Sequence, residues 1–248
     1  MKHYLDNFEL IYVKETDSTN HAIRQYEAGC NKEFLVLSAE YQTQGKGQRG
    51  NSWESERGKN LMFSLSFCPT FLPVQQQFLL SQIISLSIID VFRRYYRRFS
   101  VKWPNDIYWR DKKMGGILIE NDIDGEHVSR CVIGVGLNIN QTEFHSGAPN
   151  PVSLLQICGM HCKRVHVLEK ILKAFEEYYR LLQAGEVEAI RERYKKVLFR
   201  KWDYHTYRDA QGEFNARLHH IEDNGKLVLK DSDGQLRSYA FKEVEFVL

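Results

Sequence analysis

The sequence contains no long hydrophobic run. Its most apolar stretch, residues 78–92, is interrupted by serines, a glutamine and an aspartate, and is shorter than the roughly 20 residues that cross a bilayer as a helix. The N-terminal residues include Lys2, Asp6 and Glu9 and lack the apolar segment of a secretory signal. We therefore expect a soluble, cytoplasmic protein without a membrane partner.

Cysteine is also scarce, with 5 residues in a chain of 248. An odd number of mostly distant cysteines is typical of a reducing compartment rather than of a disulfide framework. A chain of this length buries well over half of its unfolded surface and needs no disulfides to fold. Cys158, His161 and Cys162 come nearest to a metal cluster, but no second ligand pair accompanies them. We expect no metal held by the protein alone.

An excess of one charge is missing too. The chain has 34 Lys and Arg against 32 Asp and Glu, for a net charge of +2, whereas a domain devoted to nucleic acid usually has a pI above about 9. The strongest basic run, residues 93–98, falls at the end of an expected helix, where cations complement the helix dipole. Residues 201–248 carry more acidic than basic side chains. We therefore expect no nucleic-acid partner.

What is present is a mixture of strand and helix patterns. The apolar spacing predicts an α+β domain with a mixed sheet over residues 1–200. The expected strands cover residues 8–13, 34–37, 61–67, 100–109, 116–120 and 128–139. The expected helices cover residues 17–28, 74–98, 165–183 and 187–197.

A second, smaller unit is predicted over residues 201–248. Asp223-Asn-Gly225 and Asp231-Ser-Asp-Gly234 are typical of hairpin turns and separate short alternating segments. The expected strands here lie near residues 204–207, 214–221, 226–229, 236–241 and 244–247. We expect a small all-β module.

The first chemical motif is the glycine-rich segment 44–50. Its three glycines allow backbone N–H groups to converge on an anion, while Lys46 and Arg49 add positive charge. Trp53 follows closely and could stack on a nucleobase. A flexible surface loop without a ligand is an equally good interpretation of the segment alone.

The second motif is the segment 101–106. Pro104 limits strand pairing and exposes Asn105 and Asp106, a pair suited to ribose hydroxyls or to indirect magnesium coordination. A simple turn at the end of a strand is the alternative. A third motif follows in Lys113-Met-Gly-Gly116, where a lysine suits a carboxylate that attacks a phosphate. An isolated solvated lysine is the alternative for that residue.

The fourth motif is an alternation of glycines in one expected strand. Gly134 and Gly136 leave room on one strand face for a flat ring, and Asn138, next in the alternation, could hydrogen-bond a nucleobase edge. The glycines could instead relieve crowding against the long helix.

Together and in this order, the motifs resemble the biotin protein ligase family, in its biotin–[acetyl-CoA-carboxylase] ligase branch. The resemblance rests on Ser18-Thr-Asn20, residues 39–53, Lys102-Trp-Pro-Asn-Asp106 with Lys113-Met-Gly-Gly116, and Gly134-Val-Gly-Leu-Asn138. It implies a class II synthetase-like catalytic domain and an SH3-like C-terminal barrel. It also implies that biotin and MgATP form biotinyl-5′-AMP, from which biotin passes to one lysine of a biotin carboxyl carrier domain.

The resemblance also implies roles for individual residues. Lys113 would bridge the biotin carboxylate and the α-phosphate, and Lys113, Lys46 and Arg49 would be the catalytic group. Biotin would contact Ser18, Thr19, Asn20, Gln42, Lys46, Gly47, Gln48, Lys113, Gly115 and Gly116. The adenylate would contact Gly45, Lys46, Gly47, Arg49, Trp53, Asn105, Asp106 and Asn138, with the Mg²⁺ of ATP near Asp106.

The glycine-rich segment departs from the family pattern at its basic positions. Lys46 stands where many relatives carry arginine, and the neutral Gln48 occupies a second position that is basic in many of them. Since an amide cannot screen phosphate charge, we expect retention of the intermediate to depend more on Lys46 and Arg49.

The resemblance implies further that the partner is a carboxylase carrier protein. Only about seven residues precede Phe8, so we expect a monofunctional ligase without the helix-turn-helix of the family's repressors. Carrier docking is expected at an exposed sheet edge, and the chain could be a monomer or a homodimer. The alternatives are a lipoate or octanoate ligase of the same catalytic fold, and a catalytically dead ligand-sensing or repressor-like protein.

Overall fold

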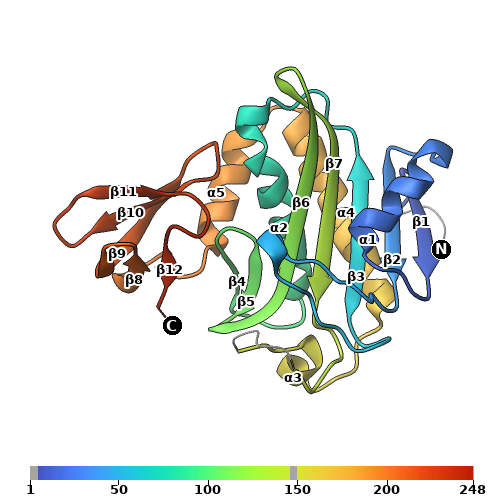
Figure 1. Cartoon of the computed structure of the whole chain (residues 1–248), viewed down its shortest axis with the longest axis horizontal. Coiled ribbons are helices and arrows are strands. Elements are labelled where there is room, and N and C mark those ends of the chain that lie inside the picture. Colours follow the sequence, from blue (N-terminus) through green and yellow to red (C-terminus); the bar gives the residue numbers. More distant parts are fainter. Residues whose placement is uncertain (1–4, 146–149, 248) are drawn as a thin grey trace.

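A mixed seven-stranded sheet forms the larger part of the protein (Figure 1). The computed structural model describes residues 5–145 and 150–247. Along the sheet the strands are β1 (Phe8–Val13), β2 (Phe34–Ala39), β3 (Leu61–Phe67), β7 (His127–Leu137), β6 (Lys112–Asp124), β5 (Asp106–Trp109) and β4 (Phe99–Lys102). The β1–β2 pair is parallel and the other pairs are antiparallel, which confirms the predicted α+β class with a mixed sheet.

Helices cover the two faces of this sheet unequally. One face is covered by α2 (Phe78–Phe92), α4 (Arg164–Gln183) and α5 (Val187–Val197) (Figure 1). Nearly all of α2 is buried, because its apolar residues interlock with those of β3, β7 and α4. The other face carries the short α1 (Thr19–Ala22) and the 3-10 turn η1 (Ile23–Gly29), which pack over Leu35, Leu37 and Val132, and the 3-10 turn η2 (Gln48–Gly50).

The register of the sheet determines which side chains share this less covered face. Residues directly opposite one another on paired strands point to the same side. One such row runs Lys102, Asp106, Gly116, Gly136, Met62. The next runs Leu118, Gly134, Ser64. Three glycines therefore form an open floor, with a lysine and an aspartate beside it.

A five-stranded antiparallel sheet follows at the C-terminus (Figure 1). Its order is β11 (Leu236–Tyr239), β10 (Leu227–Asp231), β9 (Gly212–Ile221), β8 (His205–Asp209) and β12 (Glu245–Phe246). This arrangement fits the expected SH3-like module, although no pairing of β11 with β12 closes a barrel within the described residues. The module contacts the seven-stranded sheet through Trp103, whose indole N–H donates to the carbonyl of Gly225 at 2.8 Å.

Several elements differ from the sequence prediction. The helix expected over residues 74–98 is shorter, because 74–76 form a 3-10 turn and α2 ends at Phe92. The strand expected over 100–109 is a hairpin of β4 and β5, broken at Pro104, which has no N–H to donate. The helix expected to reach residue 28 is mostly 3-10. A further helix, α3 (Leu154–Cys158), begins at a capping box formed by Ser153 and Gln156.

The structure also describes the state of the cysteines and the character of the helices. All five cysteines are free thiols. Within residues 5–145 and 150–247, no helix combines the length and the apolarity needed to cross a membrane. In the same ranges no group of three or more His, Cys, Asp or Glu side chains could hold a metal ion. The cytoplasmic location stays a prediction.

Candidate active site

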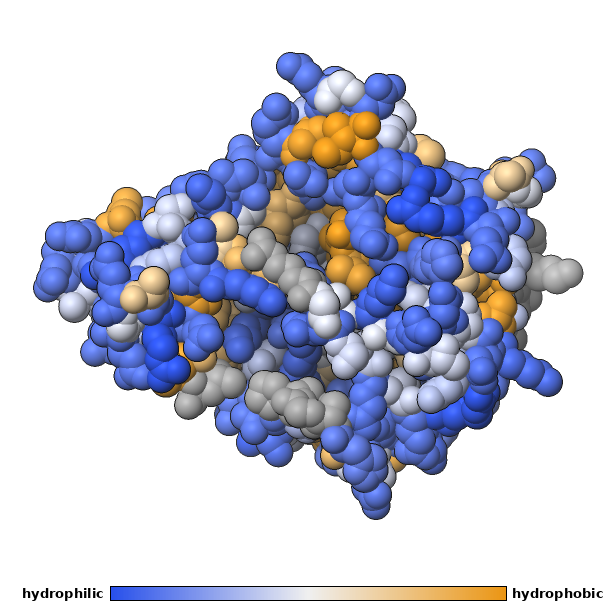
Figure 2. Space-filling view, viewed as in Figure 1, coloured by the Kyte–Doolittle hydropathy of each residue, from blue (hydrophilic) through white to orange (hydrophobic). Residues whose placement is uncertain are grey.

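A cavity of about 550 Å³ opens over the glycine floor. It lies in the face of the molecule shown in Figure 2, between the C-terminal sheet and the strands β6 and β7. Its walls come from the segment before α1, the glycine-rich segment, the β4–β5 hairpin and the C-terminal module. Segments that are distant in sequence therefore meet here. From the predicted site, the lining includes Ser18, Thr19, Asn20, Gln42, Lys46, Gly47, Gln48, Trp53, Asn105, Asp106, Lys113 and Gly116.

The polar end of the cavity is built around Thr19. Its backbone N–H and its hydroxyl both donate to Oε1 of Gln42, at 2.7 and 3.0 Å. The hydroxyl of Ser64 lies 2.8 Å from Thr19 Oγ1 and 2.6 Å from Asn20 Oδ1. Backbone bonds between residues 16–17 and 43–44 hold the two segments together. Gln42 Nε2 has no acceptor among the described residues and is available to a ligand.

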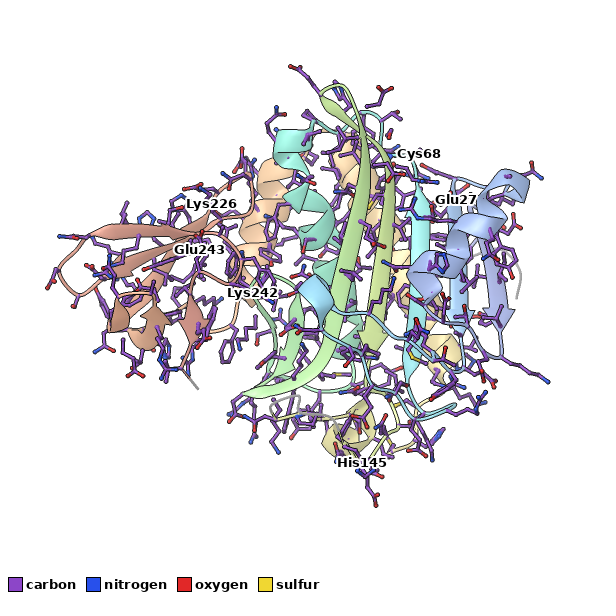
Figure 3. The ribbon with its side chains drawn as sticks, viewed as in Figure 1. Glu27, Cys68, His145, Lys226, Lys242 and Glu243 are labelled. Carbon is purple, nitrogen blue, oxygen red and sulfur yellow. The ribbon has the colours of Figure 1, made fainter. Side chains whose placement is uncertain are left out.

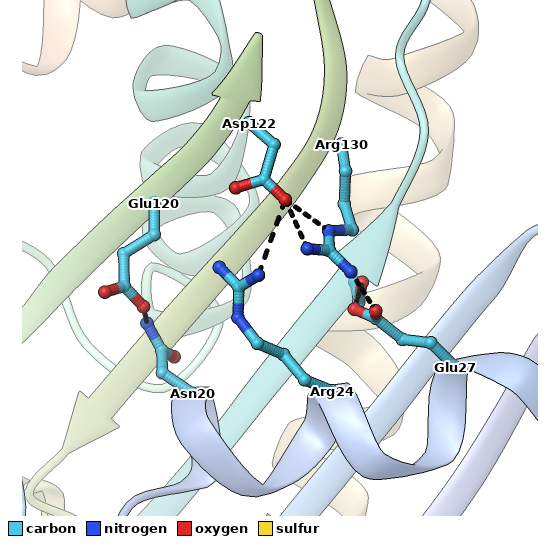
Figure 4. A network of polar contacts seen from close by, with 7 residues as sticks. Asn20, Arg24, Glu27, Glu120, Asp122 and Arg130 are labelled. Carbon is cyan, nitrogen blue, oxygen red and sulfur yellow. Dashed lines mark hydrogen bonds and ion pairs between the residues drawn. The ribbon is translucent and has the colours of Figure 1, made fainter.

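A network of charged side chains holds α1 and η1 against the sheet (Figure 4). Arg130 bonds both Asp122, at 2.7 Å from its Nε, and Glu27 of η1. Asn20 donates to Glu120 at 2.8 Å. The hydrogen bond from Arg130 lowers the pKa of Asp122, so the network stays charged at neutral pH. Its effect is to fix the position of Asn20 and therefore of the polar end.

Lys113 faces the cavity because of a β-bulge. It lies three residues before Gly116, and in a regular strand the two would point to opposite faces. The register between β5 and β6 shifts, however, so that Tyr108 opposes Lys113 while Ile107 opposes Gly115. The extra residue, Met114, turns into the core, and Lys113 points to the same face of the sheet as the glycine floor. Its Nζ then pairs with Asp106 Oδ1 at 2.7 Å.

Trp53 lies on the glycine floor. A Cβ at Gly136 would come within 2.5 Å of Trp53 Cε2, and one at Gly116 would lie 3.5 Å from Cζ3. The alternating glycines were predicted to leave room for a flat ring. At Gly136 that ring is the indole of Trp53, and Gly134 is covered by the side chain of Asn20. The indole N–H is buried without a partner among the described residues. Such a group costs about 1–3 kcal/mol until an acceptor arrives.

Gly45, Gly115 and Asn138 are predicted site residues that do not line the cavity. Asn138 is 4% exposed, and its amide donates to the carbonyl of Val152, so it anchors residues 150–154 instead. A Cβ at Gly115 would meet Leu137 at 2.5 Å, and one at Gly45 would meet the carbonyl of Trp53 at the same distance. These two glycines therefore permit close packing. The side chain of Arg49 lies outside the described residues.

The sequence interpretation missed the contribution of the C-terminal module. Phe241, Lys242, Val244, Glu245 and Phe246 form one wall of the cavity. Nothing in their short, weakly alternating pattern distinguishes them from an ordinary strand. Lys102 was also given no role, although it belongs to a conspicuous motif and lines the same end.

Comparison with known proteins places these features in a family. Residues 12–138 match the model of the biotin/lipoate A/B protein ligase family. The chain is 27% identical to the bifunctional ligase/repressor BirA of Bacillus subtilis over 235 residues, which cover 93% of this chain and 72% of that protein. It is also 27% identical to the biotin–[acetyl-CoA-carboxylase] ligase of Paracoccus denitrificans, covering 90% of this chain and 95% of the relative.

Solved structures show the same fold. The biotin protein ligase from Aquifex aeolicus in complex with biotin and ATP superposes with a TM-score of 0.79 at 23% identity, covering 96% of this chain and 99% of that one. The biotin protein ligase from Leishmania major in complex with biotin superposes with a TM-score of 0.64 at 22% identity, again over 96% and 99% of the two chains.

Proposed function

Because the chain belongs to the biotin/lipoate A/B protein ligase family, we propose that it is an ATP-dependent biotin protein ligase. It activates biotin as biotinyl-5′-AMP and transfers the biotinyl group to a lysine of a carrier domain. The observation that carries the proposal is the layout of the cavity. A polar end at Thr19 and Gln42 is joined by a glycine floor to the Lys113–Asp106 pair.

Biotin is bound with its ureido group at the polar end. A ureido ring presents one carbonyl acceptor and two N–H donors, and such groups need matched partners in a pocket. The free Nε2 of Gln42 can donate to the carbonyl, and the hydroxyls of Ser18 and Thr19 can accept from the N–H groups. The valeryl chain then runs past Trp53, which itself covers Gly136, and brings the carboxylate to Lys113.

Lys113 acts on the first chemical step. A carboxylate oxygen of biotin bonds to the α-phosphorus of ATP, the bond to the bridging oxygen breaks, and pyrophosphate leaves with the electron pair. The Lys113 ammonium lies where it can neutralise both the attacking carboxylate and the α-phosphate, which would otherwise repel each other. Mg²⁺ enters with ATP as its substrate complex, and Asp106 offers it a carboxylate oxygen. A base-reading role for Asn138 stays a prediction.

In the second step, the amine of a carrier lysine attacks the acyl carbon of the intermediate and AMP leaves. The partner is the biotin carrier of a carboxylase. We place its docking at the edge of β6 from Leu118 to Asp124, since β5 pairs with β6 only up to Gly116. Ile123 on this edge is 54% exposed. A strand added here would obtain backbone hydrogen bonds, and a second copy of the chain could dimerise through the same edge.

The proposal is tested by biotin-dependent exchange of labelled pyrophosphate into ATP. We expect exchange with biotin and none with lipoate or octanoate, followed by transfer of biotin to a purified carrier domain. Exchange with lipoate alone would identify the chain as a lipoate ligase. Exchange with none of the three acids would favour a ligand-sensing protein without catalysis.

Replacing Gln48 by arginine is expected to slow release of the adenylate by about tenfold, because a charge-assisted hydrogen bond replaces a neutral contact. Gln48 lines the cavity, and its Oε1 is buried with no partner in the described part of the chain. The measurement is a chase of labelled biotinyl-5′-AMP from the protein. Gln44→Arg is the control, since Gln44 is exposed and outside the lining. Equal release rates for wild type and Gln48→Arg would contradict the prediction.

A further inference from the structure

A surface of unpaired cations lies at the end of the β4–β5 hairpin that points away from the cavity. The turn of the hairpin lines the cavity, whereas its open end meets the segment after α2 and the link into the C-terminal module, which lies beside the hairpin (Figure 3). The cations that gather here are called the basic surface: Arg93, Arg94, Arg97, Arg98, Arg110 and Lys201. In residues 5–145 and 150–247, no carboxylate forms an ion pair with any of the six, and this includes the neighbouring Asp111 and Asp203.

The dipole of α2 accounts for at most one of the four arginines in residues 93–98. The last turn of α2 contains no basic residue, and the helix ends at Phe92, before the first of them. The favourable effect of a helix dipole on cations falls off within the last turn. Arg94 and Arg97 are exposed, and within the described residues their side chains form no hydrogen bond. These two guanidinium groups are therefore free to bind an external anion.

The backbone holds two of the arginines in a strained arrangement. Arg98 and Arg110 face each other just beyond the last pair of the hairpin, Phe99 with Trp109, and the Arg110 N–H donates to the Arg98 carbonyl at 3.1 Å. Both have a positive φ, +72° and +54°, which is uncommon for residues other than glycine. Like charges opposite each other on paired strands also destabilise a sheet. Strain of this kind clusters at ligand-binding sites.

Lys201 connects the arginines to the link into the C-terminal module. Its Nζ donates to the carbonyl of Lys196 and lies 4.6 Å from the ring centre of Trp202. Burial lowers the pKa of this ammonium, and Arg93 and Lys196 lower the pKa further. Cations from the ends of α2 and α5 therefore lie close enough to repel each other, and a polyanion would relieve that repulsion.

Exposed aromatic rings lie among these cations. Between residues 93 and 112 and between 195 and 204, the exposed large apolar side chains are all aromatic, namely Tyr96 (46% exposed), Trp202 (70%) and Tyr204 (47%). We propose that the basic surface binds single-stranded nucleic acid, with its cations on the phosphates and with Tyr96 and Trp202 stacked on bases. Surfaces that bind single strands combine positive charge along the backbone with aromatic side chains on which bases stack. The inference does not depend on the proposed function.

Other polyanions fit this surface less well. An acidic polypeptide would satisfy the charges but has no flat bases to cover the aromatic side chains. An anionic bilayer favours aliphatic side chains that insert between its lipids, and none is exposed in these segments. A duplex keeps its bases stacked on one another. The net charge of +2, from which we expected no nucleic-acid partner, is an average over the whole chain and conceals this local excess.

The test is binding of a fluorescein-labelled oligothymidylate of about 20 nucleotides, longer than a typical single-strand site, to the full-length protein, measured by anisotropy at increasing salt. For Arg94→Gln/Arg97→Gln we expect about tenfold weaker binding near 0.1 M salt and a slope of log Kd against log salt lower by about 1.4, because each phosphate contact on a single strand contributes about 0.7. The matched control is Lys14→Gln/Lys226→Gln, which removes two exposed cations. Lys14 follows β1 at the opposite edge of the sheet, and Lys226 lies in the turn that faces the start of α2 (Figure 3).

A second pair of variants separates stacking from charge. Trp202→Ala should weaken binding about tenfold without changing the salt slope, and Trp202→Phe should retain most of the affinity. Biotin-dependent exchange should stay at the wild-type rate in all of these variants, because the substituted residues do not line the cavity.

Failure of wild type to bind the strand, or equal affinity of wild type and Arg94→Gln/Arg97→Gln, would overturn the inference. Polyglutamate or phosphatidylglycerol vesicles that displace the strand as well as unlabelled oligothymidylate does would identify an acidic protein or a membrane as the partner, and would overturn it too. An oligouridylate of the same length distinguishes the source, since preference for either strand supports the inference and assigns it to RNA or to DNA.

Discussion

Replacing Lys113 by alanine is expected to reduce biotin-dependent adenylation by about 10²–10³-fold, even at saturating ATP and biotin. The ammonium lies on the same face of the sheet as the glycine floor and contacts Asp106 at 2.7 Å. Without it, a carboxylate must approach a phosphate with no charge between them. The decrease should appear in kcat of the exchange reaction rather than in the half-saturating concentration of biotin, whose ureido end binds elsewhere.

The control for this experiment lies one residue away. Lys112→Ala removes the same charge from an exposed position that does not line the cavity, and it should exchange like wild type. The thermal unfolding midpoint of both variants checks that the sheet is intact. Turnover of Lys113→Ala near the wild-type rate would exclude the role proposed for this lysine.

Replacing Gly136 by alanine is expected to have the second largest effect. The new Cβ would come within 2.5 Å of Trp53 Cε2 and 2.8 Å of its Nε1, so the indole must leave the floor. We expect the adenylate to dissociate about 10–100-fold faster, because an aromatic contact with a flat ligand contributes about 1–3 kcal/mol. A chase of labelled intermediate measures the rate.

Two further variants show whether Trp53 is the cause. Gly29→Ala adds a methyl group where nothing lies within 4 Å, and it should behave as wild type. In a Trp53→Ala background there is no indole to displace, so adding Gly136→Ala should change little, and the two effects should not be additive. Full additivity would mean that the methyl group acts through the sheet itself.

The strands of the catalytic sheet could be predicted because their apolar residues alternate or form short buried runs. The interpretation of residues 61–67 matches β3 at both ends, since Phe63, Leu65 and Phe67 all face the core. The helix predicted over residues 74–98 extends beyond α2 at both ends. Its pattern has no stop signal before the basic run, whereas the backbone turns out of the helix after Phe92.

Lining residues could be predicted where one local motif brings its own groups together, as in residues 18–20 and 105–106. They were less predictable where tertiary register decides. The alternation of side chains along the strand correctly placed Gly134 and Gly136 on one face. Applied to Asn138, the same rule predicted a residue facing the ligand, whereas Asn138 is buried and bonds the carbonyl of Val152. The wall formed by Phe241 to Phe246 depends on how two sheets meet, and no local pattern in the sequence encodes that contact.

Because of the bulge beside Met114, the face to which Lys113 points depends on whether an odd or an even number of residues separates it from Gly116. Met114, which lies between Lys113 and Gly116, has no partner residue on β5. The Lys113 ammonium reaches the cavity because of how many residues separate these two positions. Substitution can alter the chemistry of this segment gradually, whereas the loss or gain of a single residue would exchange the two faces of the strand at once. Length in this segment is therefore under a stricter constraint than the identity of Met114 itself.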